Sequence, residues 1–538
     1  MTRDVFAQAA LRQVPKILTL LDRNPHSPTY GCFDRNYWHY RLIDFPSGMA
    51  QEFVLPLALA FDTDTPHNPY HRQRKLVAWV EAGIEFAARS AHPSGSCDDY
   101  YPYEQAAGAA AFSLLACVES YELLHLDRED LSAFFSRRAD WLARHEEVGR
   151  ISNHQALIAL ALHRTGQLLS SSQWDHDRDR LLDRLLEWQS PEGWFPEYDG
   201  MDSGYQTLTL WCLARLHDDR PDERLEKAIR RSVELLLWFL HPDGTFGGEY
   251  NSRNTYSFFP AGFERVGRWL PEALSVNERF AEALAVGNAP CHDDDHILGH
   301  HTWNYLIAYR DWVEDRPSPA ASPPTGRRWI KDAGLLVDRT ENAALYVALS
   351  KGSIFRYYRD GRFVCSDTQL SVRVRHRGKI RTAAGHLVSG FNVEVDIGTI
   401  RVEGPLAWAK QARMTTARLV ILRLGMLTIG RLFPNLVRSL LQRLLIVGSR
   451  AAPLRLVRTL TRREGGWHVR DELTAERWRD VQAVGIGCDQ TSIYVAMSRV
   501  FHPAQLQPWE DLTDSIQGLA DGEPLIVERV LDAWPVTG

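Results

Sequence analysis

Apolar residues follow two different rhythms along this chain of 538 residues. In the first part they recur at every third or fourth position, the spacing of helices that bury one face. This spacing predicts helices over residues 72–91, 104–125, 128–146, 153–168, 173–189, 203–217, 222–240, 272–285 and 297–314. Later, apolar and polar residues alternate over 370–382, 391–404 and 492–500, as in half-buried strands. The chain is therefore predicted to be helical first and predominantly β afterwards.

The two parts are separated by the segment DRPSPAASPPTGRR, residues 315–328. Its prolines and small polar residues can neither continue a helix nor pair in a sheet. The chain is also longer than one hydrophobic core usually serves, so at least two domains are expected. We therefore place a helical domain at residues 1–314, a linker at 315–328 and a β domain at 329–538.

Two stretches of the helical part are similar to each other, LLEWQSPEGWFPEYDGMDSGYQT (185–207) and LLWFLHPDGTFGGEYNSRNTYSF (236–258). In each, a helix ends, a Pro-Glu-Gly or Pro-Asp-Gly turn follows, and an aromatic loop leads to the next helix. Helical hairpins that cannot bury their own apolar faces stack side by side and can close into an α/α toroid. Loops at corresponding ends then line one face. Here they are rich in groups that stack on sugars and bind carboxylates.

Positive charge is concentrated in one segment, although the net charge of the chain is only −6. Between Gly404 and Arg463 there is no acidic residue, but there are Lys410 and eleven arginines. Residues 418–450 combine arginines with leucines at helical spacing, a pattern typical of a helical hairpin lying in an anionic membrane surface. The alternative is a helical insert packed on the β domain, with its arginines paired to acids elsewhere. No uncharged run is long enough to cross a bilayer.

Cysteine usage and the N-terminal sequence bear on the compartment. Seven scattered cysteines without CxxC spacing predict neither a disulfide framework nor a zinc site. The first residues show no pattern of a secretory signal. We therefore expect a cytoplasmic protein, peripheral at the inner membrane if residues 415–450 bind lipid. We expect no cofactor, no metal and no nucleic-acid partner.

An Asn–His pair stands where the helix predicted at 153–168 begins. In SNHQALIALALHRTG, Ser152 and Gln155 have the spacing of a capping box, which would place Asn153 and His154 in the first turn. The positive end of the helix dipole disfavours a protonated imidazole, so His154 is expected to be neutral and able to accept a proton. The alternative is a pair that only caps or packs.

A tyrosine occupies the corresponding place about one repeat later. In EYDGMDSGYQT, Tyr205 lies just inside a helix that should start near Asp202 or Ser203. It could act as a catalytic phenol, or it could pack between toroid helices. Because one repeat separates His154 from Tyr205, we expect both side chains at the same end of neighbouring hairpins.

The Asn153–His154 pair, the EYDGMDSGYQT segment, the helical part and the β part together resemble the heparinase II/III-type polysaccharide lyase family. The resemblance covers most of the chain, although it is diffuse outside these motifs. It implies an N-terminal α/α toroid that is an incomplete barrel. It also implies an antiparallel β-sandwich, which here carries a basic helical insert at about 405–450.

The resemblance also implies residue roles. Asn153 would neutralise the carboxylate of a uronic acid residue, His154 would be a base or a carboxylate partner, and Tyr205 would donate a proton to the leaving oxygen. These groups suit the chemistry, because a proton next to a carboxylate is only weakly acidic until that charge is cancelled and donors stabilise the developing enolate.

One feature departs from the family pattern. The family usually has a His-x-Asp arrangement near the first long strand of the β domain, where this chain has Cys365 and Asp367. His376 and His386 are alternatives that no spacing supports. The second acid or base of the family therefore has no clear counterpart in the sequence.

Further polar and aromatic residues are candidates for substrate binding. Arg253 could clamp a carboxylate, or it could form a surface ion pair with Glu249. Glu197 is expected to bind a hydroxyl or to brace a loop. The other candidates come from the aromatic loops of the repeat, an N-terminal aromatic segment and a His-rich segment: Trp194, Asn254, Asn36, Tyr37, His39 and His300.

The His-rich segment CHDDDHILGHHTWNY, residues 291–305, invites a metal assignment. No HExxH motif accompanies its histidines, however. We favour a helix that begins near Asp293–Asp295 and brings His300 or His301 to the site, without a metal. The potential metal ligands of this segment are His292, Asp294, His296, His300 and His301.

The expected function is a polysaccharide lyase that abstracts the C5 proton of a uronate in an anionic polysaccharide and eliminates the C4 substituent, in exopolysaccharide synthesis or processing. A C5-epimerase would use the same first step. An α/α-toroid glycoside hydrolase would need two carboxylates, for example among Glu197, Asp202 and Glu249. A non-catalytic glycan-binding protein is the remaining alternative.

Overall fold

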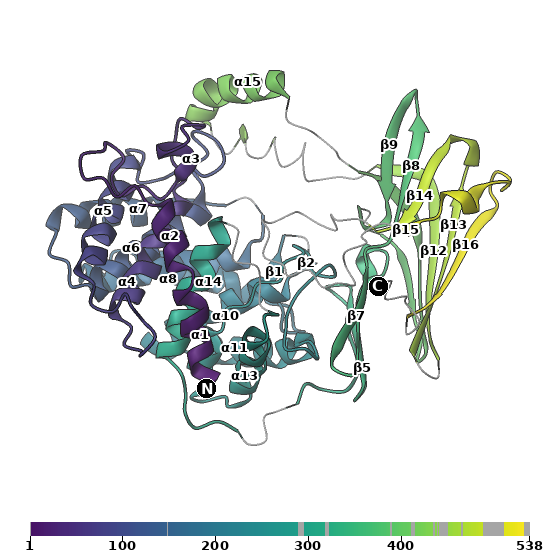
Figure 1. Cartoon of the computed structure of the whole chain (residues 1–538), viewed down its shortest axis with the longest axis horizontal. Helices are drawn as coiled ribbons and strands as arrows, with labels where there is room; N and C mark the ends of the chain where they lie inside the picture. Colours follow the sequence, from purple (N-terminus) through teal and green to yellow (C-terminus); the bar gives the residue numbers. More distant parts are fainter. Residues whose placement is uncertain are drawn as a thin grey trace.

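The computed structural model describes residues 2–147, 149–198, 200–288, 295–317, 322–387, 390–409, 415–433, 450–463, 466–487 and 510–531, together with residues 436, 437 and 440. The helical part lies on the left of Figure 1 and two sheets lie on the right. The predicted division into a helical and a β part is confirmed.

The helical part is a double ring. Six inner helices contact one another in sequence, and the last returns to the first: α4 (Val54–Asp62), α6 (Ala107–Leu123), α8 (Ser152–Leu168), α10 (Ser203–Asp219), α12 (Ala261–Gly267) and α14 (Asp295–Arg310). Outside them pack α1 (Thr2–Leu11), α5 (Arg74–Ser90), α7 (Glu129–Arg144), α9 (Asp175–Trp188), α11 (Glu223–Phe239) and α13 (Glu272–Ala285). The predicted α/α toroid is confirmed, and contacts between neighbouring inner helices run from α4 round to α14 and back to α4.

Composition explains which helices lie inside. The sequences of α6, α8 and α10 are apolar or small on nearly every side, and most of their residues are buried. Helices α5 and α11 instead carry a charged face and bury only one stripe. The nine predicted helices agree with the observed ones to within a few residues, whereas α1, α4 and α12 were not predicted.

The repeated turns fix the spacing between hairpins. Gly193 and Gly244 have φ of +99° and +80°, which favours glycine, and a Cβ on either would lie within 2.4 Å of a carbonyl oxygen of the neighbouring outer helix. A third turn of the same kind lies at Gly95, in the segment HPSGS. The repeat seen in the sequence contains only the turns at Gly193 and Gly244. Each turn therefore seats one hairpin directly on the next.

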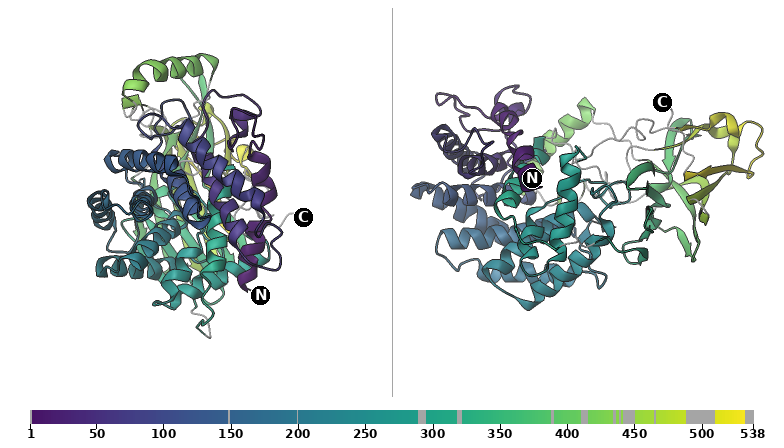
Figure 2. Two further views of the ribbon diagram at one scale, coloured as in Figure 1. Left: turned by 90° about the vertical axis from the view of Figure 1, so that its left-hand side faces the viewer. Right: turned by 60° about the horizontal axis from the view of Figure 1, so that its bottom comes forward.

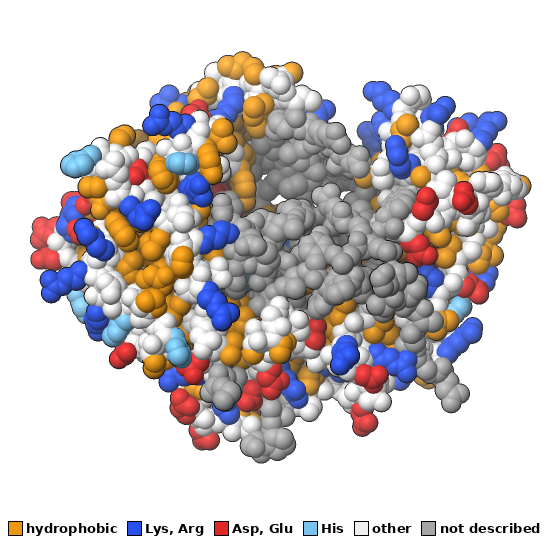
Figure 3. All heavy atoms as spheres, viewed as in Figure 1, with side chains coloured by type: hydrophobic (Ala, Val, Ile, Leu, Met, Phe, Trp, Pro, Cys, Tyr) orange, Lys and Arg blue, Asp and Glu red, His pale blue; other side chains and the backbone are white. Residues whose placement is uncertain are grey.

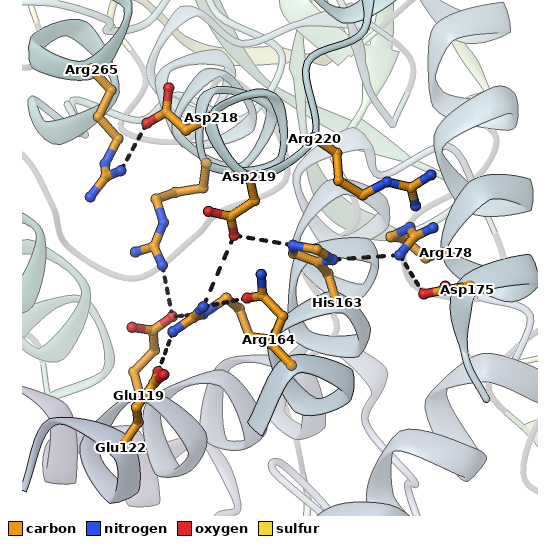
Figure 4. A network of polar contacts seen from close by, with 12 residues as sticks. Glu119, Glu122, His163, Arg164, Asp175, Arg178, Asp218, Asp219, Arg220 and Arg265 are labelled. Atoms are coloured by element: carbon orange, nitrogen blue, oxygen red, sulfur yellow. Dashed lines mark hydrogen bonds and ion pairs between the residues drawn. The ribbon is translucent and has the colours of Figure 1, made fainter. Parts of the chain in front are cut away.

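The C-terminal ends of the inner helices are joined by a network of ion pairs (Figure 4). Glu119 of α6 accepts hydrogen bonds from Arg164 of α8 at 2.7 Å and from Arg215 of α10 at 3.1 Å. Burial alone would raise the pKa of Glu119, but Arg215 and Arg164 outweigh it and lower the pKa. His163 extends the network to Asp219. We call these residues the far-end network.

The β part contains two antiparallel sheets. The first has five strands in sequence order: β3 (Gly326–Ile330), β4 (Leu335–Arg339), β5 (Ala343–Ala348), β6 (Ile354–Arg359) and β7 (Arg362–Asp367). The second has the order β15-β14-β8-β9-β11-β12-β13-β16, with β10 paired to β11. Its strands are β8 (Leu370–His376), β9 (Lys379–Ala384), β10 (Asn392–Val395), β11 (Thr399–Trp408), β12 (Ala451–Arg463), β13 (Gly466–Ala475), β14 (Val481–Ile486), β15 (Glu510–Asp511) and β16 (Pro524–Val530).

The five-stranded sheet lies between the toroid and the larger sheet. Along β5, Ala344, Tyr346 and Ala348 belong to the core shared with the helices. Leu345 and Val347 point to the opposite face and pack with residues of the larger sheet. The predicted antiparallel two-sheet architecture is confirmed, and both faces of the middle sheet are buried. Of the predicted strands, 492–500 lies outside the described residues.

The basic insert leaves the larger sheet between β11 and β12. It contains α15 (Thr416–Gly425), which continues into a π-helical turn, η4 (Met426–Gly430). Figure 1 shows α15 above the toroid, near the short helix α3 (Arg35–Trp38), and Figure 2 shows the same arrangement from two other sides. Among the described helices, none combines the length and hydropathy needed to cross a bilayer.

Candidate functional site

The predicted catalytic residues lie at the N-terminal ends of inner helices, on the side of the toroid that faces the five-stranded sheet. A two-stranded hairpin, β1 (Pro196–Glu197) and β2 (Gly200–Met201), lies there between the helices and the β part (Figure 1). Ile151, directly before α8, forms a β-bridge with Glu197. The loop that precedes α10 is thereby held against the start of α8.

Helix α8 is not capped as predicted. It begins at Ser152, and Ile151 at the N-cap gives no side-chain cap, so the capping box is wrong. The Ser152 hydroxyl instead donates to the carbonyl oxygen of Pro196 at 2.6 Å. The carboxylate of Glu197 takes over the capping, because its Oε1 accepts from the backbone N–H of Asn153 at 3.1 Å. A residue one repeat away thus caps the helix.

Asn153 is held by the same carboxylate. Its Nδ2 donates to Oε1 of Glu197 at 2.6 Å, which fixes the orientation of the amide since a carboxylate only accepts. The side chain is fully buried, and among the described residues its Oδ1 has no hydrogen-bond partner. Asn153 therefore braces Glu197 in this structure, and its predicted contact with a substrate carboxylate stays a prediction.

His154, the next residue along α8, pairs with a different acid. Its Nδ1 lies 2.9 Å from Oε2 of Glu147, and its side chain is 21% exposed. The ring lies over Gly108 of α6, where a Cβ would come within 2.6 Å of it. Burial opposes protonation, but Glu147 outweighs burial, so the pKa of His154 is raised. The helix dipole by itself predicts a neutral imidazole, but Glu147 favours the protonated form.

Tyr205 is placed as predicted, three residues after an N-cap. Asp202 caps α10 by accepting from the N–H groups of Gly204 and Tyr205, both at 3.0 Å. Tyr205 is 7% exposed, and no described residue hydrogen-bonds its hydroxyl. Burial raises the pKa of this phenol, against the opposing effect of Arg253. At neutral pH Tyr205 is therefore a proton donor.

Arg253 joins these groups into one cluster. Its guanidinium lies over the rings of Tyr198 and Tyr205, 4.6 and 4.8 Å from their centroids, and its Nη1 donates to Oε2 of Glu197 at 3.3 Å. Its backbone N–H donates to Asp202. The alternative ion pair with Glu249 is not formed, since Glu249 accepts from Tyr256 at 2.5 Å instead. The Nε of Arg253 is buried without a partner among the described residues.

The remaining loop candidates are divided between two places. Asn254 adjoins Arg253, has a left-handed φ of +53°, and has a buried Oδ1 that accepts no hydrogen bond from a described residue. Trp194 instead packs against the toroid core, and its indole N–H donates to Glu192. Glu192 in turn accepts from the backbone of Lys331 in the β part. Asn254 lies with the site, whereas Trp194 lies at the contact between the two parts.

His300 lies deeper in the toroid. Helix α14 begins at Asp295, as favoured, and places His300 against the ring of Phe112, with centroids 4.1 Å apart. Phe112 is one turn after Gly108 on α6, so His300 lies one turn deeper than His154. Its Nδ1 is 2.6 Å from Glu52, and the side chain is buried. The structure thus gives His300 a buried carboxylate partner.

The N-terminal candidates lie elsewhere. Asn36 and Tyr37 belong to α3, which Asp34 caps, and His39 follows it with its ring against Trp38 and Tyr40. Figure 1 shows α3 near α15, away from β1 and β2. Among the described residues, α3 and His39 make no contact with His154 or Tyr205. A role for Asn36, Tyr37 and His39 in substrate binding therefore stays a prediction.

The described residues contain no group of three or more potential metal ligands close enough to hold an ion. His292, Asp294 and the side chain of His296 lie outside the described residues. For this reason the structure offers no test of the metal alternative for the whole His-rich segment.

Two residues of the β part bear on the site, Asp367 and Lys351, and only Asp367 could be noticed from the sequence. Asp367, at the place of the family's His-x-Asp, is fully engaged by Arg458 and Arg529. Burial is outweighed by these arginines, which lower the pKa of Asp367 and mark it as structural. Lys351 instead reaches the site loop, where its Nζ donates to the carbonyl oxygen of Asn251. Burial lowers its pKa to about 7, against the attraction of Asp202 and Glu249.

Comparison with known proteins supports the fold. No protein-family model and no curated protein sequence match the chain. The chondroitin AC lyase of Streptomyces coelicolor A3, in complex with chondroitin sulphate, is similar in structure with a TM-score of 0.54 at 12% identity, over 90% of this chain and 67% of that one. A xanthan lyase of Paenibacillus has a TM-score of 0.53 at 10% identity, over 90% of this chain and 46% of that one.

These likenesses establish a fold and no more. This chain has the toroid-plus-sheet architecture of polysaccharide lyases. It spans less than half of the xanthan lyase and about two thirds of the chondroitin lyase. A heparinase III structure aligns with a TM-score of 0.48, too low to add to the argument. The narrower resemblance to the heparinase II/III type is therefore supported only at the level of the lyase fold.

Proposed function

We propose that this protein is a polysaccharide lyase that removes the C5 proton of a uronate residue and expels the C4 substituent. The observation that carries the proposal is the cluster of Tyr205, Arg253 and Glu197 beside His154, at the end of the toroid nearest the β part. The cluster combines a protonated phenol with two groups that can be cationic. These are the groups needed to bind a carboxylate and to move a proton next to it.

The roles follow from the contacts. Arg253 and protonated His154 would bind the uronate carboxylate, because both carry positive charge and retain some exposure. Tyr205 would hand its proton to the leaving oxygen, and the adjacent guanidinium stabilises the phenolate so formed. Asn153 would act by holding Glu197, which in turn holds Arg253. Alternatively, His154 in its neutral form would take the C5 proton and leave the carboxylate to Arg253, while Tyr205 stays protonated for the donation.

The hydrolase alternative is less well supported. Of its candidate carboxylates, Asp202 is fully buried and caps α10, while Glu197 caps α8 and pairs with Arg253. Glu249 is bound to Tyr256. A hydrolase needs one carboxyl group that donates a proton to the leaving oxygen and another that attacks or activates water. Burial raises the pKa of Glu197 and Asp202, but both already accept several hydrogen bonds from the protein.

The test is product analysis with the full chain and a panel of uronate-containing polymers. A lyase gives ultraviolet absorbance from the C4=C5 double bond. A C5-epimerase gives deuterium uptake at C5 in heavy water without cleavage, and a hydrolase gives new reducing ends without absorbance. Binding without any of these products, or no binding at all, would overturn the proposal. The polymer itself and a cytoplasmic place of action stay predictions.

A further inference from the structure

The basic insert exposes an unusual density of apolar side chains. In the described part of residues 419–440, ten large apolar side chains are between 45% and 73% exposed: Leu419, Val420, Ile421, Leu424, Leu427, Ile429, Leu432, Phe433, Leu436 and Leu440. Isolated exposed apolar residues are ordinary, but a continuous group of this size on one short segment marks a binding surface. We call this group the apolar patch.

One side of the insert is anchored to the toroid. Arg423 pairs with Asp44 at 2.5 Å and lies over the ring of Phe45, and Met426 is fully buried. Arg431 lies over the ring of Tyr103. Arg423, Met426 and Gly430 follow one another at helical spacing, so they define the anchored face. The orientation of the insert is therefore set by specific contacts.

The rest of the insert faces solvent. Val420, Leu424 and Leu427 also follow one another at helical spacing, beside the anchored residues, and all three are about half exposed. Figure 3 shows apolar side chains along the top of the molecule, over α15. The patch continues onto the toroid, where Tyr40, Leu42 and Tyr100 are 54%, 73% and 72% exposed in the loops that contain Asp44 and Tyr103.

Charge indicates what this surface binds. Arg418 and Arg431 are exposed beside the apolar patch, and no acidic residue occurs between Gly404 and Arg463. A second copy of the same surface would be repelled by its like charge. An anionic lipid surface meets both needs, since it takes apolar side chains at the level of its headgroups and attracts arginines.

We propose that the insert and the adjoining toroid loops dock this protein onto an anionic lipid bilayer, with Val420, Leu424 and Leu427 entering the headgroup region. The anchored face ties the toroid, and hence its substrate site, to that surface. The binding is peripheral, because no described helix is long and apolar enough to span the bilayer. The inference is independent of the reaction that the site performs.

The test is flotation of the full chain with two kinds of vesicle, phosphatidylcholine alone and phosphatidylcholine mixed with phosphatidylglycerol. The protein should float with the mixed vesicles only, and high salt should weaken the binding by screening. The variant Leu424→Gln/Leu427→Gln should lose most of it. Arg418→Gln should weaken it about fivefold, the usual effect of one basic residue near an anionic surface. Ile397→Gln is the matched control, since Ile397 is 96% exposed in the β part.

Light scattering on the same variants tests whether the apolar patch binds a second copy of the chain instead of a lipid surface. Failure of the unmodified chain to bind mixed vesicles overturns the proposal, as does equal binding by the Leu424→Gln/Leu427→Gln variant. If that variant instead abolishes self-association and no vesicle binding is seen, the patch is an interface between copies. Equal binding to vesicles of phosphatidylcholine alone would refute the claim that the surface must be anionic. Because the side chains are exposed, a folding defect is not expected, and circular dichroism checks this.

Discussion

The two ends of the inner helices carry very different polar groups. At the far-end network, Glu119 is matched by Arg164 and Arg215, and His163 by Asp219. At the end where α8 and α10 begin, several buried atoms have no partner among the described residues, namely Asn153 Oδ1, Arg253 Nε and Asn254 Oδ1, and the Tyr205 hydroxyl is unbonded.

This difference separates stability from function. Buried polar groups are usually satisfied within the protein, because an unsatisfied one costs free energy. The paired groups of the far-end network follow this rule, as expected of groups that hold helices together. An exception is Nη2 of Arg178 beside His163, which has no hydrogen-bond partner among the described residues. The site end departs from it in a small volume, which is the pattern of groups that await a polar ligand. Substitutions at the two ends should therefore affect different measurements.

The largest effect is expected for Tyr205→Phe. This substitution removes the proposed proton donor and no hydrogen bond to a described residue, so turnover should fall about a thousandfold while the melting temperature changes little. Tyr309→Phe is a close control, because Tyr309 is also 7% exposed and also lies beneath an arginine, Arg3, at 4.4 Å. If Tyr205→Phe and Tyr309→Phe show similar turnover, Tyr205 is not the proton donor.

The converse effect is expected at the far end. Glu119→Gln leaves Arg164 and Arg215 without their partner, which is only 18% exposed, so the free energy of unfolding should fall by about 3 kcal/mol. Turnover per folded molecule should be unchanged. Glu122→Gln is the control, since Glu122 also pairs with Arg164 but is half exposed, and exposed pairs contribute little. Urea unfolding compares the two, and a loss of turnover without a loss of stability would contradict the division between the ends.

A smaller effect, on pH dependence, is expected for Glu147→Gln. Glu147 is what raises the pKa of His154, so the variant should shift the corresponding limb of the pH–rate profile to lower pH. An acidic limb that shifts identifies His154 as the base, whereas an alkaline limb that shifts identifies it as the cation that binds the carboxylate. If neither limb moves, His154 takes no part in the reaction.

The same variant has a consequence for stability. A raised pKa in the folded state contributes stability that is present below the unfolded value of 6.5 and is lost as the pH rises through the folded pKa. Stability of the unmodified chain should therefore decline in the window just above pH 6.5, and Glu147→Gln should reduce this decline. Thermal unfolding across that window measures it.

The positions of Asn153, His154 and Tyr205 could be predicted from sequence. The helical period indicates where each helix begins, and the repeat length places these residues at the same end of neighbouring hairpins. The acidic residues that contact them could not be predicted. Glu147 lies in a loop that no periodicity places, and Glu197 caps a helix one repeat earlier, which only tertiary structure shows. Local reasoning therefore gave the wrong cap and missed the acid that favours protonation of His154.

The β part shows the same limit more strongly. Strand alternation was sufficient to predict antiparallel sheets, but it does not indicate that one sheet lies against the toroid with both faces buried. Asp367 could be noticed only as a departure from a motif, and its two arginine partners come from strands far along the chain. Lys351 reaches the site loop only because the two parts pack together.

The smallest effect in the comparison of the two ends is expected at Lys351, because burial at the site end disfavours the charged form of this lysine. Its pKa is lowered from 10.5 to about 7, so between these values the unfolded chain binds a proton that the folded chain does not. Stability should therefore rise with pH across this window. Lys351→Met should remove the rise and stabilise the protein slightly at neutral pH, whereas Lys331→Met, at an exposed lysine in the turn between β3 and β4, should leave the slope intact. A slope that survives in Lys351→Met would mean that another group is responsible and that Lys351 keeps its charge beside Asp202.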